Sequence, residues 1–196
     1  MESLHAEMSI SFNQSLALSD EASDREGTGD SWPGSSFNAL VRFKDPWFIE
    51  AGLFSAAGDS IEDKRPLQTP SPGEGNVWVI SPYSDIVVTG YHLQLGYRFY
   101  IYNFPEVYPK FAFFCDLSAG YFDIISAKRE FTNYDAGGSL AKNLKLDVGP
   151  YIQPRINLMY QPQNWEHWYI GAQASYEQYF SSDVERGWSY GFVFGR

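Results

Sequence analysis

The sequence predicts an all-β protein, an eight-stranded antiparallel up-and-down transmembrane β-barrel. Three observations lead to this fold class. Eight segments alternate apolar and polar residues with a period of two, which is typical of strands whose two faces meet different surroundings. The connections between these segments alternate between long and short, and charged residues lie almost entirely on one face of each segment.

The last two segments show the alternation most clearly. Residues 168–180 place apolar side chains at every second position except Gln178, against a face that contains Gly, Gln, Ser and Glu. Residues 188–196 place aromatic residues on one face and Ser, Gly and Val on the other. The complete set of expected strands is 8–18, 37–44, 47–54, 86–103, 111–125, 144–160, 168–180 and 188–196.

One of these strands contains prolines. Pro150 and Pro154 both fall on the apolar face of residues 144–160. Proline lacks the N–H that a strand donates to its neighbour, so it is normally confined to edges and bulges. The segment 144–160 is therefore the weakest strand of the set.

The connections set the topology of a single domain spanning residues 1–196, with a flexible amino end at 1–7. Neighbouring antiparallel strands put every second connection at the same end of the sheet. One end of the barrel therefore carries the long loops, and the other carries the tight turns and both termini. Residues 76–80 are a candidate strand extension within the second long loop. The long loops are expected at 19–36, 55–85 and 126–143.

Composition excludes several classes of function. The net charge of −10 argues against binding nucleic acid by charge. The one cysteine, Cys115, excludes a disulfide within the chain. The acidic residues 20–30 do not match the spacing of an EF-hand, so neither a metal site nor a cofactor is expected. Residues 1–7 lack the apolar core of a signal peptide, and we favour a leader that has been removed over a cytoplasmic protein.

The charged faces indicate which side of the barrel meets lipid. A soluble barrel would pack the aromatic faces inward, but an eight-stranded interior is too narrow for so many large rings. The inverse arrangement puts the apolar faces in lipid and the charged residues in the interior. There the charges either neutralise one another in a plugged interior or line a gate for a narrow permeation path. The charges expected inside are Arg42, Glu50, Arg98, Asp116, Lys145, Asp147, Arg155 and Glu177.

Aromatic residues outside the strand centres have two expected roles. Trp and Tyr gather at membrane interfaces, where an apolar ring meets polar headgroups. Exposed aromatics in loops are typical contact points for a partner or a glycan, which makes Trp32 and Trp78 candidates. The interfacial girdle near the short turns is expected to comprise Trp47, Tyr160, Trp165, Trp168 and Phe194.

This pattern resembles the small outer-membrane β-barrels, and is similar to the OmpA transmembrane domain and the OmpX-like proteins. The resemblance implies a bacterial outer membrane, periplasmic termini, and contact with membrane lipid and lipopolysaccharide. The stretch Leu95–Phe99 looks like a strand of that family, whereas the terminal Gly195 and Arg196 depart from it. The residues that look like the family's assembly signal are Trp188, Tyr190, Gly191, Phe192 and Phe194.

Three functions remain open from the sequence. The first is non-enzymatic: a surface barrel whose loops bind a protein partner, or a subunit of an envelope assembly. The second is a lipid A-modifying acyl enzyme using His92, with Ser81 or Ser84 nearby in sequence, although a lone histidine is more often a hydrogen-bonded core residue. The third is a soluble, lipocalin-like ligand-binding barrel.

Overall fold

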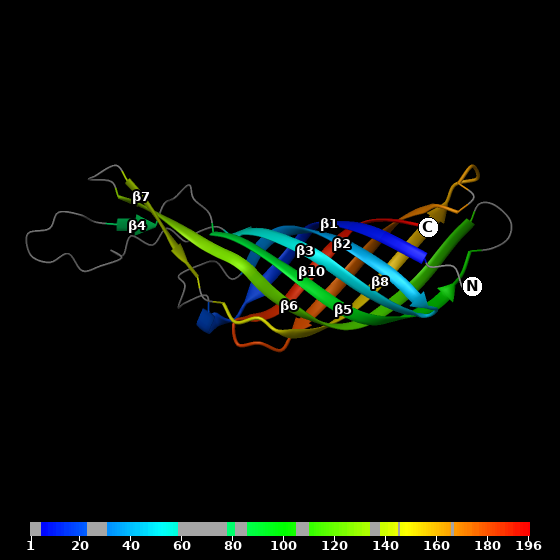
Figure 1. Ribbon diagram of the computed structural model, residues 1–196, viewed down its shortest axis with the longest axis horizontal. Helices are drawn as coiled ribbons and strands as arrows, with labels where there is room; N and C mark the ends of the chain where they lie inside the picture. Colours follow the sequence, from blue (N-terminus) through cyan, green and yellow to red (C-terminus); the bar gives the residue numbers. More distant parts are fainter. Residues whose placement is uncertain are drawn as a thin grey trace, which may run out of the picture.

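The computed structural model describes residues 5–22, 31–58, 78–80, 86–104, 110–133, 138–144, 146–165 and 167–196, with most of their side chains. Figure 1 shows an elongated barrel with both termini at one end and a strand extension at the other. The barrel strands are β1 (His5–Leu18), β2 (Ser31–Lys44), β3 (Trp47–Gly58), β5 (Ile86–Tyr102), β6 (Lys110–Asn133), β8 (Pro150–Gln161), β9 (Tyr169–Tyr179) and β10 (Val184–Gly195).

Eight strands close the sheet completely. Pairing runs β6-β5-β3-β2-β1-β10-β9-β8, all antiparallel, and β6 pairs with β8 to complete the ring. Every central strand therefore has two neighbours, which satisfies the backbone hydrogen bonds that lipid cannot. The predicted fold class is confirmed.

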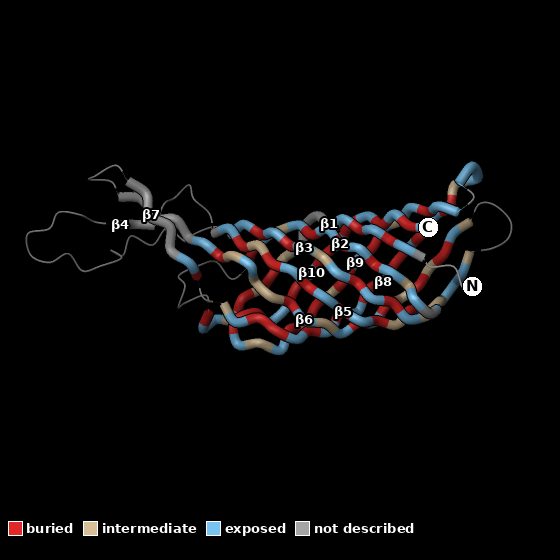
Figure 2. Tube along the Cα trace, viewed as in Figure 1, coloured by how far each residue is buried: buried red, intermediate tan, exposed pale blue. Residues whose placement is uncertain are grey.

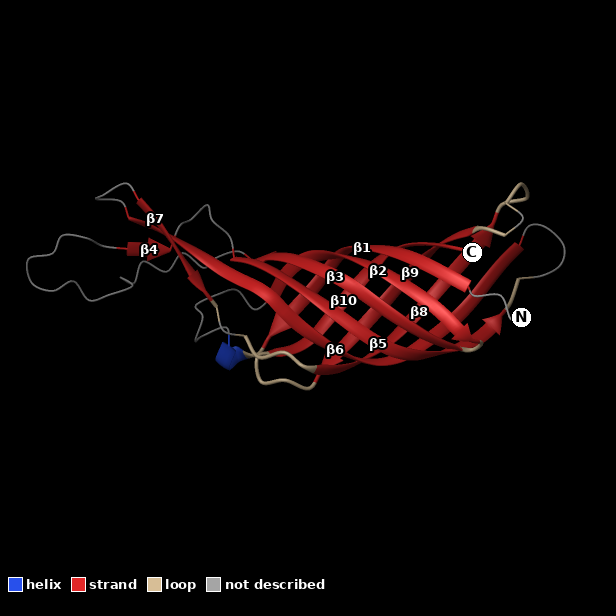
Figure 3. Cartoon of the chain, in the orientation of Figure 1, coloured by secondary structure: helices blue, strands red, loops and turns tan. Residues whose placement is uncertain are grey.

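Strand β6 is longer than either of its barrel neighbours, β5 and β8, and continues beyond the barrel wall. It has 24 residues, and its far end pairs on one side with β4 (Trp78–Ile80) and on the other with β7 (Gly138–Asn143). Figure 3 shows this extension projecting from the end opposite the termini. The expected loop at 126–143 is therefore wrong over most of its length, because it forms the β6–β7 hairpin. The expected extension at 76–80 corresponds to β4.

Other boundaries also differ from the expectation. Strand β1 begins at His5, inside the amino end that was expected to be flexible, and β2 begins at Ser31, inside the expected loop 19–36. Residues 20–22 form one helical turn. Among the described residues, no helix is long and apolar enough to cross a membrane. Strand β8 begins only at Pro150, so residues 144 and 146–149 are not strand.

The two faces of the wall are opposite to those of a soluble protein. Burial alternates residue by residue along β8 and along β10 from Gly187 onward, and Figure 2 shows buried and exposed residues alternating along much of the wall. Leu93 and Phe192 are 56% and 60% exposed on the outside, whereas Arg98 is 2% exposed on the inside. An apolar exterior around an ionic interior is the arrangement of a transmembrane barrel. The alternative of a soluble, lipocalin-like barrel is wrong for the same reason.

A bulge in β1 reverses the faces of its second half. The register of β1 against both β2 and β10 shifts between Ser11 and Ser15. One extra residue moves all later side chains to the opposite face. Uninterrupted alternation from Met8 predicts an outward face for Leu16 and Leu18, but with the extra residue both are buried inside the barrel.

The prolines of β8 are accommodated in the closed wall. Pro150 and Pro154 point outward, and β8 pairs with β6 along its full length. The pairing of β8 with β9 passes from Ile152 opposite Gln178 to Arg155 opposite Ser175, and skips the residues between. Pro154, which has no backbone N–H to donate, lies in this gap in the ladder between β8 and β9. The ladder between β8 and β6 is therefore continuous. The segment is not an edge strand.

The interior is layered from one end to the other. An apolar plug at the loop end surrounds Trp32, Phe54, Phe122 and Tyr179. A second apolar cluster at the turn end includes Phe114, Met159 and Tyr169. Polar and charged side chains lie between the two, and they form the site described next.

Candidate functional site

The ionic interior contains two clusters, and the first surrounds Arg98. Its guanidinium donates from Nε to Asp116 Oδ1 at 2.8 Å and from Nη2 to Asp116 Oδ2 at 3.1 Å. The same group donates from Nη1 and Nη2 to the two carboxylate oxygens of Glu7. Glu7, Arg98 and Asp116 are all less than 5% exposed, so they form a desolvated and doubly bidentate ion pair.

Neighbouring side chains complete this first cluster. Tyr169 donates to Glu7 Oε1 at 2.6 Å, and Asn157 donates to Asp116 Oδ2 at 3.1 Å. The guanidinium of Arg98 lies 3.7 Å from the ring centroid of Phe114, which is a cation–π contact. Arg42 approaches Glu7 at 3.5 Å and donates to Tyr100 at 2.6 Å. Two carboxylates thus face two arginines.

The second cluster surrounds Glu50 and lies nearer the apolar plug. Arg155 Nη1 and Gln94 Nε2 each donate to Glu50, at 2.6 Å in both cases. Gln153 accepts from Arg155 and from Gln94, and donates to Glu177 Oε1 at 2.7 Å. A continuous chain of polar contacts therefore links strands β3, β5, β8 and β9 across the interior.

His92 belongs to this second cluster. Its Nε2 lies 3.6 Å from Glu50 Oε1, and its ring faces that of Tyr151 edge-on. The imidazole is 8% exposed and points inside the barrel, away from the lipid-facing wall. An acyl enzyme needs its histidine next to the lipid substrate, so this position does not support the lipid A-modifying role that the sequence left open.

The expected charges do not all lie in this interior. Glu50, Arg98, Asp116, Arg155 and Glu177 are buried there, and Arg42 lies at its turn-end edge. Asp147 was expected inside, which is wrong: it is exposed at the loop end, because residues 146–149 precede β8 and are not part of the wall. Lys145 lies outside the described residues.

Glu7 is an interior residue that sequence reasoning missed. Its carboxylate is the hub of the first cluster, yet residues 1–7 were assigned to a flexible end. A signal was present, because Glu7, Ser9 and Ser11 continue the polar face of β1 opposite Met8 and Ile10.

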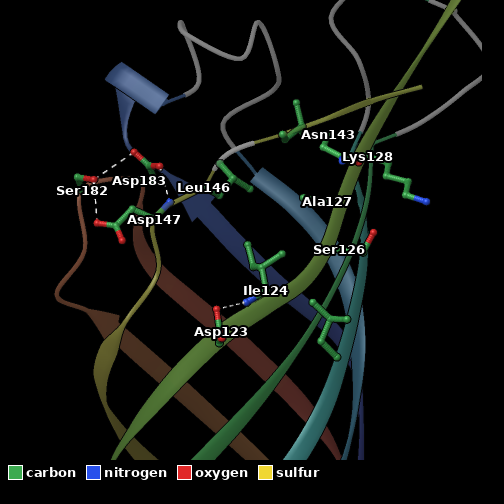
Figure 4. A pocket seen from close by; sticks show the side chains of 12 residues that line it. Asp123, Ile124, Ser126, Ala127, Lys128, Asn143, Leu146, Asp147, Ser182 and Asp183 are labelled. Carbon is green, nitrogen blue, oxygen red and sulfur yellow. Dashed lines mark hydrogen bonds between the residues drawn. The ribbon is translucent and has the colours of Figure 1, made fainter. Parts of the chain in front are cut away.

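A groove opens at the loop end, between β6 and the segments that follow β7 and β9 (Figure 4). Its volume is about 910 Å³, and its acidic members are Asp123, Asp147 and Asp183. Asp183 anchors the rim: it accepts from the backbone N of Asp147 at 2.6 Å and from Ser182 Oγ at 3.2 Å. The other lining residues are Ile124, Ile125, Ser126, Ala127, Lys128, Asn143, Leu144, Leu146 and Ser182.

A second cavity, of about 930 Å³, opens at the turn end beneath the Arg98 cluster. Arg42, Arg98 and Tyr169 line its floor, and His167 and Arg196 line it as well. The two large openings are therefore separated by the packed interior. At the level of Glu50 the free volume is only about 10 Å³, so the described interior leaves no continuous channel there.

The expected girdle residues lie exposed on the wall. Trp168 stacks on Phe194 with ring centroids 4.8 Å apart, and Trp165 meets the same ring edge-on at 6.0 Å. Tyr160 packs against Phe111, and Trp47 packs against Tyr97. The proposed assembly residues of β10 show the same sidedness: Trp188, Tyr190, Phe192 and Phe194 are exposed, and Gly191 is buried.

The two expected loop contacts have different outcomes. Trp32 is fully buried in the apolar plug, so its assignment as an exposed contact is wrong. The reason is that Ser31–Ser36 is strand, which turns Trp32 inward opposite Leu16. Trp78 lies in β4, and its side chain is outside the described residues.

The closed wall, the apolar exterior and the ionic interior define the class: a small eight-stranded transmembrane β-barrel of the outer-membrane kind. The sequence matches no protein-family profile and no curated protein. Among solved structures, the chain is similar to Ail, the attachment invasion locus protein of Yersinia pestis (16% identity, 98% of each chain covered, TM-score 0.44). It is also similar to Neisserial surface protein A (8% identity, 97% of this chain and 95% of that one, TM-score 0.47).

Proposed function

We propose that the protein is a non-enzymatic surface barrel of a bacterial outer membrane that binds a basic segment of a partner at the loop-end groove. The observation that carries this proposal is the groove itself. It lies at the end of the barrel that bears the strand extension, and it combines carboxylates with apolar side chains.

The chemistry of the groove favours a positively charged ligand. Its described lining has three carboxylates, from Asp123, Asp147 and Asp183, against one cation, Lys128. Ile124 and Leu146 add apolar surface beside these charges. The whole chain carries a net charge of −10, so long-range steering acts in the same direction. A basic peptide segment with apolar side chains fits this combination.

The orientation in the membrane follows the proposal of an outer-membrane location. The turn end, with both termini, faces the periplasm, and the groove and strand extension face the cell exterior. Lipopolysaccharide then surrounds the loop end of the wall, and phospholipid surrounds the girdle of Trp165 and Trp168. Under the same proposal, outward aromatics of β10 are the assembly signal, since β10 closes the barrel against β1.

Location is tested in a Gram-negative host that produces the chain behind a secretory leader. We expect it in the outer-membrane fraction, with gel mobility that changes on boiling. Protease added to intact cells should cut at the loop end and leave the barrel protected. A chain found in the soluble fraction would refute the location.

Ligand binding is tested by fluorescence anisotropy, with a labelled oligolysine peptide as the probe and an oligoglutamate peptide as the sign control. The variant Asp123→Asn/Asp147→Asn removes two groove charges and keeps both shapes. We expect its affinity for oligolysine to fall about fivefold, from about 0.5 kcal/mol per exposed contact.

The matched control is Glu21→Gln/Glu185→Gln, which removes two exposed charges at the same end but outside the groove. This control should bind the probe almost as the unmodified chain does. Equal losses in the two double variants would show that oligolysine responds only to net charge, and the groove would be rejected as the site.

A further inference from the structure

The outer wall at the turn end passes from apolar side chains to a cation. Met8 on β1 lies opposite Phe194 on β10, and Phe194 lies opposite Ile170 on β9. These three residues are exposed on the outside of the wall, and we call them the apolar row. Two residues beyond Phe194, and therefore on the same outward face, the chain places the exposed Arg196.

Arg196 is held at this rim by its backbone and by a neighbouring ring. Its backbone N donates to Ala6 O at 3.0 Å, which continues the ladder between β10 and β1. Its guanidinium carbon lies 5.6 Å from the centroid of the Trp168 ring, which is a cation–π contact. Trp168 in turn stacks on Phe194 at 4.8 Å. The positive charge of Arg196 therefore lies beside an aromatic stack, between the apolar row and the end of the barrel.

Two cavities adjoin each other at this stack. The smaller one lies beside the turn between β8 and β9 and has a volume of about 440 Å³. The larger one is the turn-end cavity of about 930 Å³, which shares three lining residues with the smaller one and is also lined by Arg196. The shared residues are His167, Trp168 and Phe194, and the smaller cavity is completed by Asn164 and Trp165.

The mixture of groups around these cavities fits an amphiphilic anion. Arg196 supplies a positive charge, and the imidazole of His167 supplies an N–H donor. Phosphate oxygens accept from both kinds of group. The rings of Trp165 and Trp168 offer the amphipathic surface that favours the boundary between headgroups and acyl chains. A glycerophospholipid has these features in the same order, with a phosphate, then a glycerol, then acyl chains.

The cation beside the stack also discriminates between headgroups. Aromatic rings bind quaternary ammonium groups, but such a group on Trp168 would lie close to the guanidinium of Arg196, and like charges repel. Asp45, the carboxylate among the described lining residues of the larger cavity, accepts from Tyr100 at 2.8 Å and lies 3.6 Å from Arg42. It is therefore already paired. The site favours a headgroup with a net negative charge.

We propose that the turn-end rim binds one anionic glycerophospholipid of the surrounding leaflet, with its phosphate between Arg196 and His167 and one acyl chain along the apolar row. Trp165 and Trp168 pack against the glycerol. This site lies at the end opposite the acidic groove, so it goes beyond the proposed peptide ligand and does not depend on it. It requires that the wall lies in lipid, as the class of the protein implies.

The test is native mass spectrometry of the chain released from detergent micelles, with phosphatidylglycerol and phosphatidylcholine of identical acyl chains as competing probes. The first headgroup is anionic and the second is zwitterionic, so the pair isolates the effect of headgroup charge. We expect the chain to retain one phosphatidylglycerol molecule in preference to phosphatidylcholine. Equal retention of the two lipids would overturn the proposal. Preferential retention of lipid A, added as a third competitor, would overturn it as well.

The matched variants are Arg196→Gln and Arg186→Gln, which each remove one exposed arginine near opposite ends of β10. Arg196→Gln keeps the backbone contact with Ala6 and should weaken phosphatidylglycerol binding about fivefold, as expected for one arginine at an anionic lipid surface. Arg186→Gln changes the net charge equally but should leave the affinity unchanged, because Arg186 is not among the described lining residues of either cavity. Equal effects of the two variants, including no effect of either, would contradict the proposal.

A second measurement needs no variant. Amide NMR spectra of the unmodified chain are compared in nanodiscs of phosphatidylcholine with and without added phosphatidylglycerol. The backbone amides of Trp168 and Arg196 and the indole N–H of Trp165 should shift, whereas the amide of Arg186 should not. Shifts that are absent, or spread evenly over both ends of the barrel, would refute the site whether or not Arg196→Gln folds.

Discussion

Replacing Glu7 with Gln tests whether the first residues of the chain hold the interior together. Glu7 is 4% exposed and accepts two hydrogen bonds from Arg98 and one from Tyr169. The substitution keeps the size of the side chain but removes its charge, so the balanced cluster of two carboxylates and two arginines gains one uncompensated positive charge. Breaking a buried ion pair in this way costs about 3–5 kcal/mol.

The expected loss lies at the low end of that range. Arg98 keeps its bidentate contact with Asp116, at 2.8 and 3.1 Å, so it is not left without a partner. We therefore expect Glu7→Gln to lower the free energy of unfolding by about 3 kcal/mol. When Arg98→Met is combined with Glu7→Gln, the change in the free energy of unfolding should differ strongly from the sum of the two single changes, because the two residues are in direct contact.

The measurement is reversible urea unfolding in phospholipid vesicles, followed by fluorescence of the six tryptophans. Glu185→Gln, an exposed carboxylate on β10, is the control and should change stability by no more than about 0.5 kcal/mol. A loss below about 1 kcal/mol for Glu7→Gln, comparable with an exposed salt bridge, would refute the view that β1 contributes a desolvated ion pair.

Three further changes test other parts of the architecture. Leu93→Arg, at a lipid-facing position, should destabilise the barrel in vesicles by about 2–4 kcal/mol; a neutral result would mean that this face is not in lipid. Trp32→Ala should lower the free energy of unfolding by about 3–5 kcal/mol, as expected for a core tryptophan. If Trp32 were instead an exposed contact residue, the same urea titration would show almost no change. Gly52→Ala places a methyl group against Asn38 and His92 and should lower the boiling-sensitive folded fraction on gels. Gly149→Ala, where the nearest atom is 3.8 Å from the new Cβ, should leave that fraction unchanged.

The sequence was most informative where the alternation of faces is uninterrupted. Along β8, and along β10 from Gly187 onward, every second residue faces the interior, so Arg155 and Phe192 could be assigned to their sides without coordinates. The outward-facing Pro150 and Pro154 did not break this alternation of faces, because only the hydrogen-bond ladder between β8 and β9 is interrupted.

The same reasoning failed where one residue is inserted into a strand. The bulge in β1 moves Leu16 and Leu18 to the inside, where they meet Trp32 and build the apolar plug. A bulge cannot be located reliably in a single sequence, because the alternation of apolar and polar residues continues on both sides of it with the opposite phase. The long β6 extension was missed for another reason: residues 126–133 are mostly polar, and polar residues without a clear alternation look like loop residues.

By itself, the sequence determined the number of barrel strands, their antiparallel order, and which face of each meets lipid except beyond the bulge of β1, because these depend on a period of two that an uninterrupted strand keeps. The tertiary structure decided which interior charges meet. Glu7 and Arg98 are far apart in the chain, and so are Glu50 and Arg155; whether they touch depends on the stagger of strands around the closed barrel. That stagger is set by many backbone pairings at once, so no local pattern of residues specifies it.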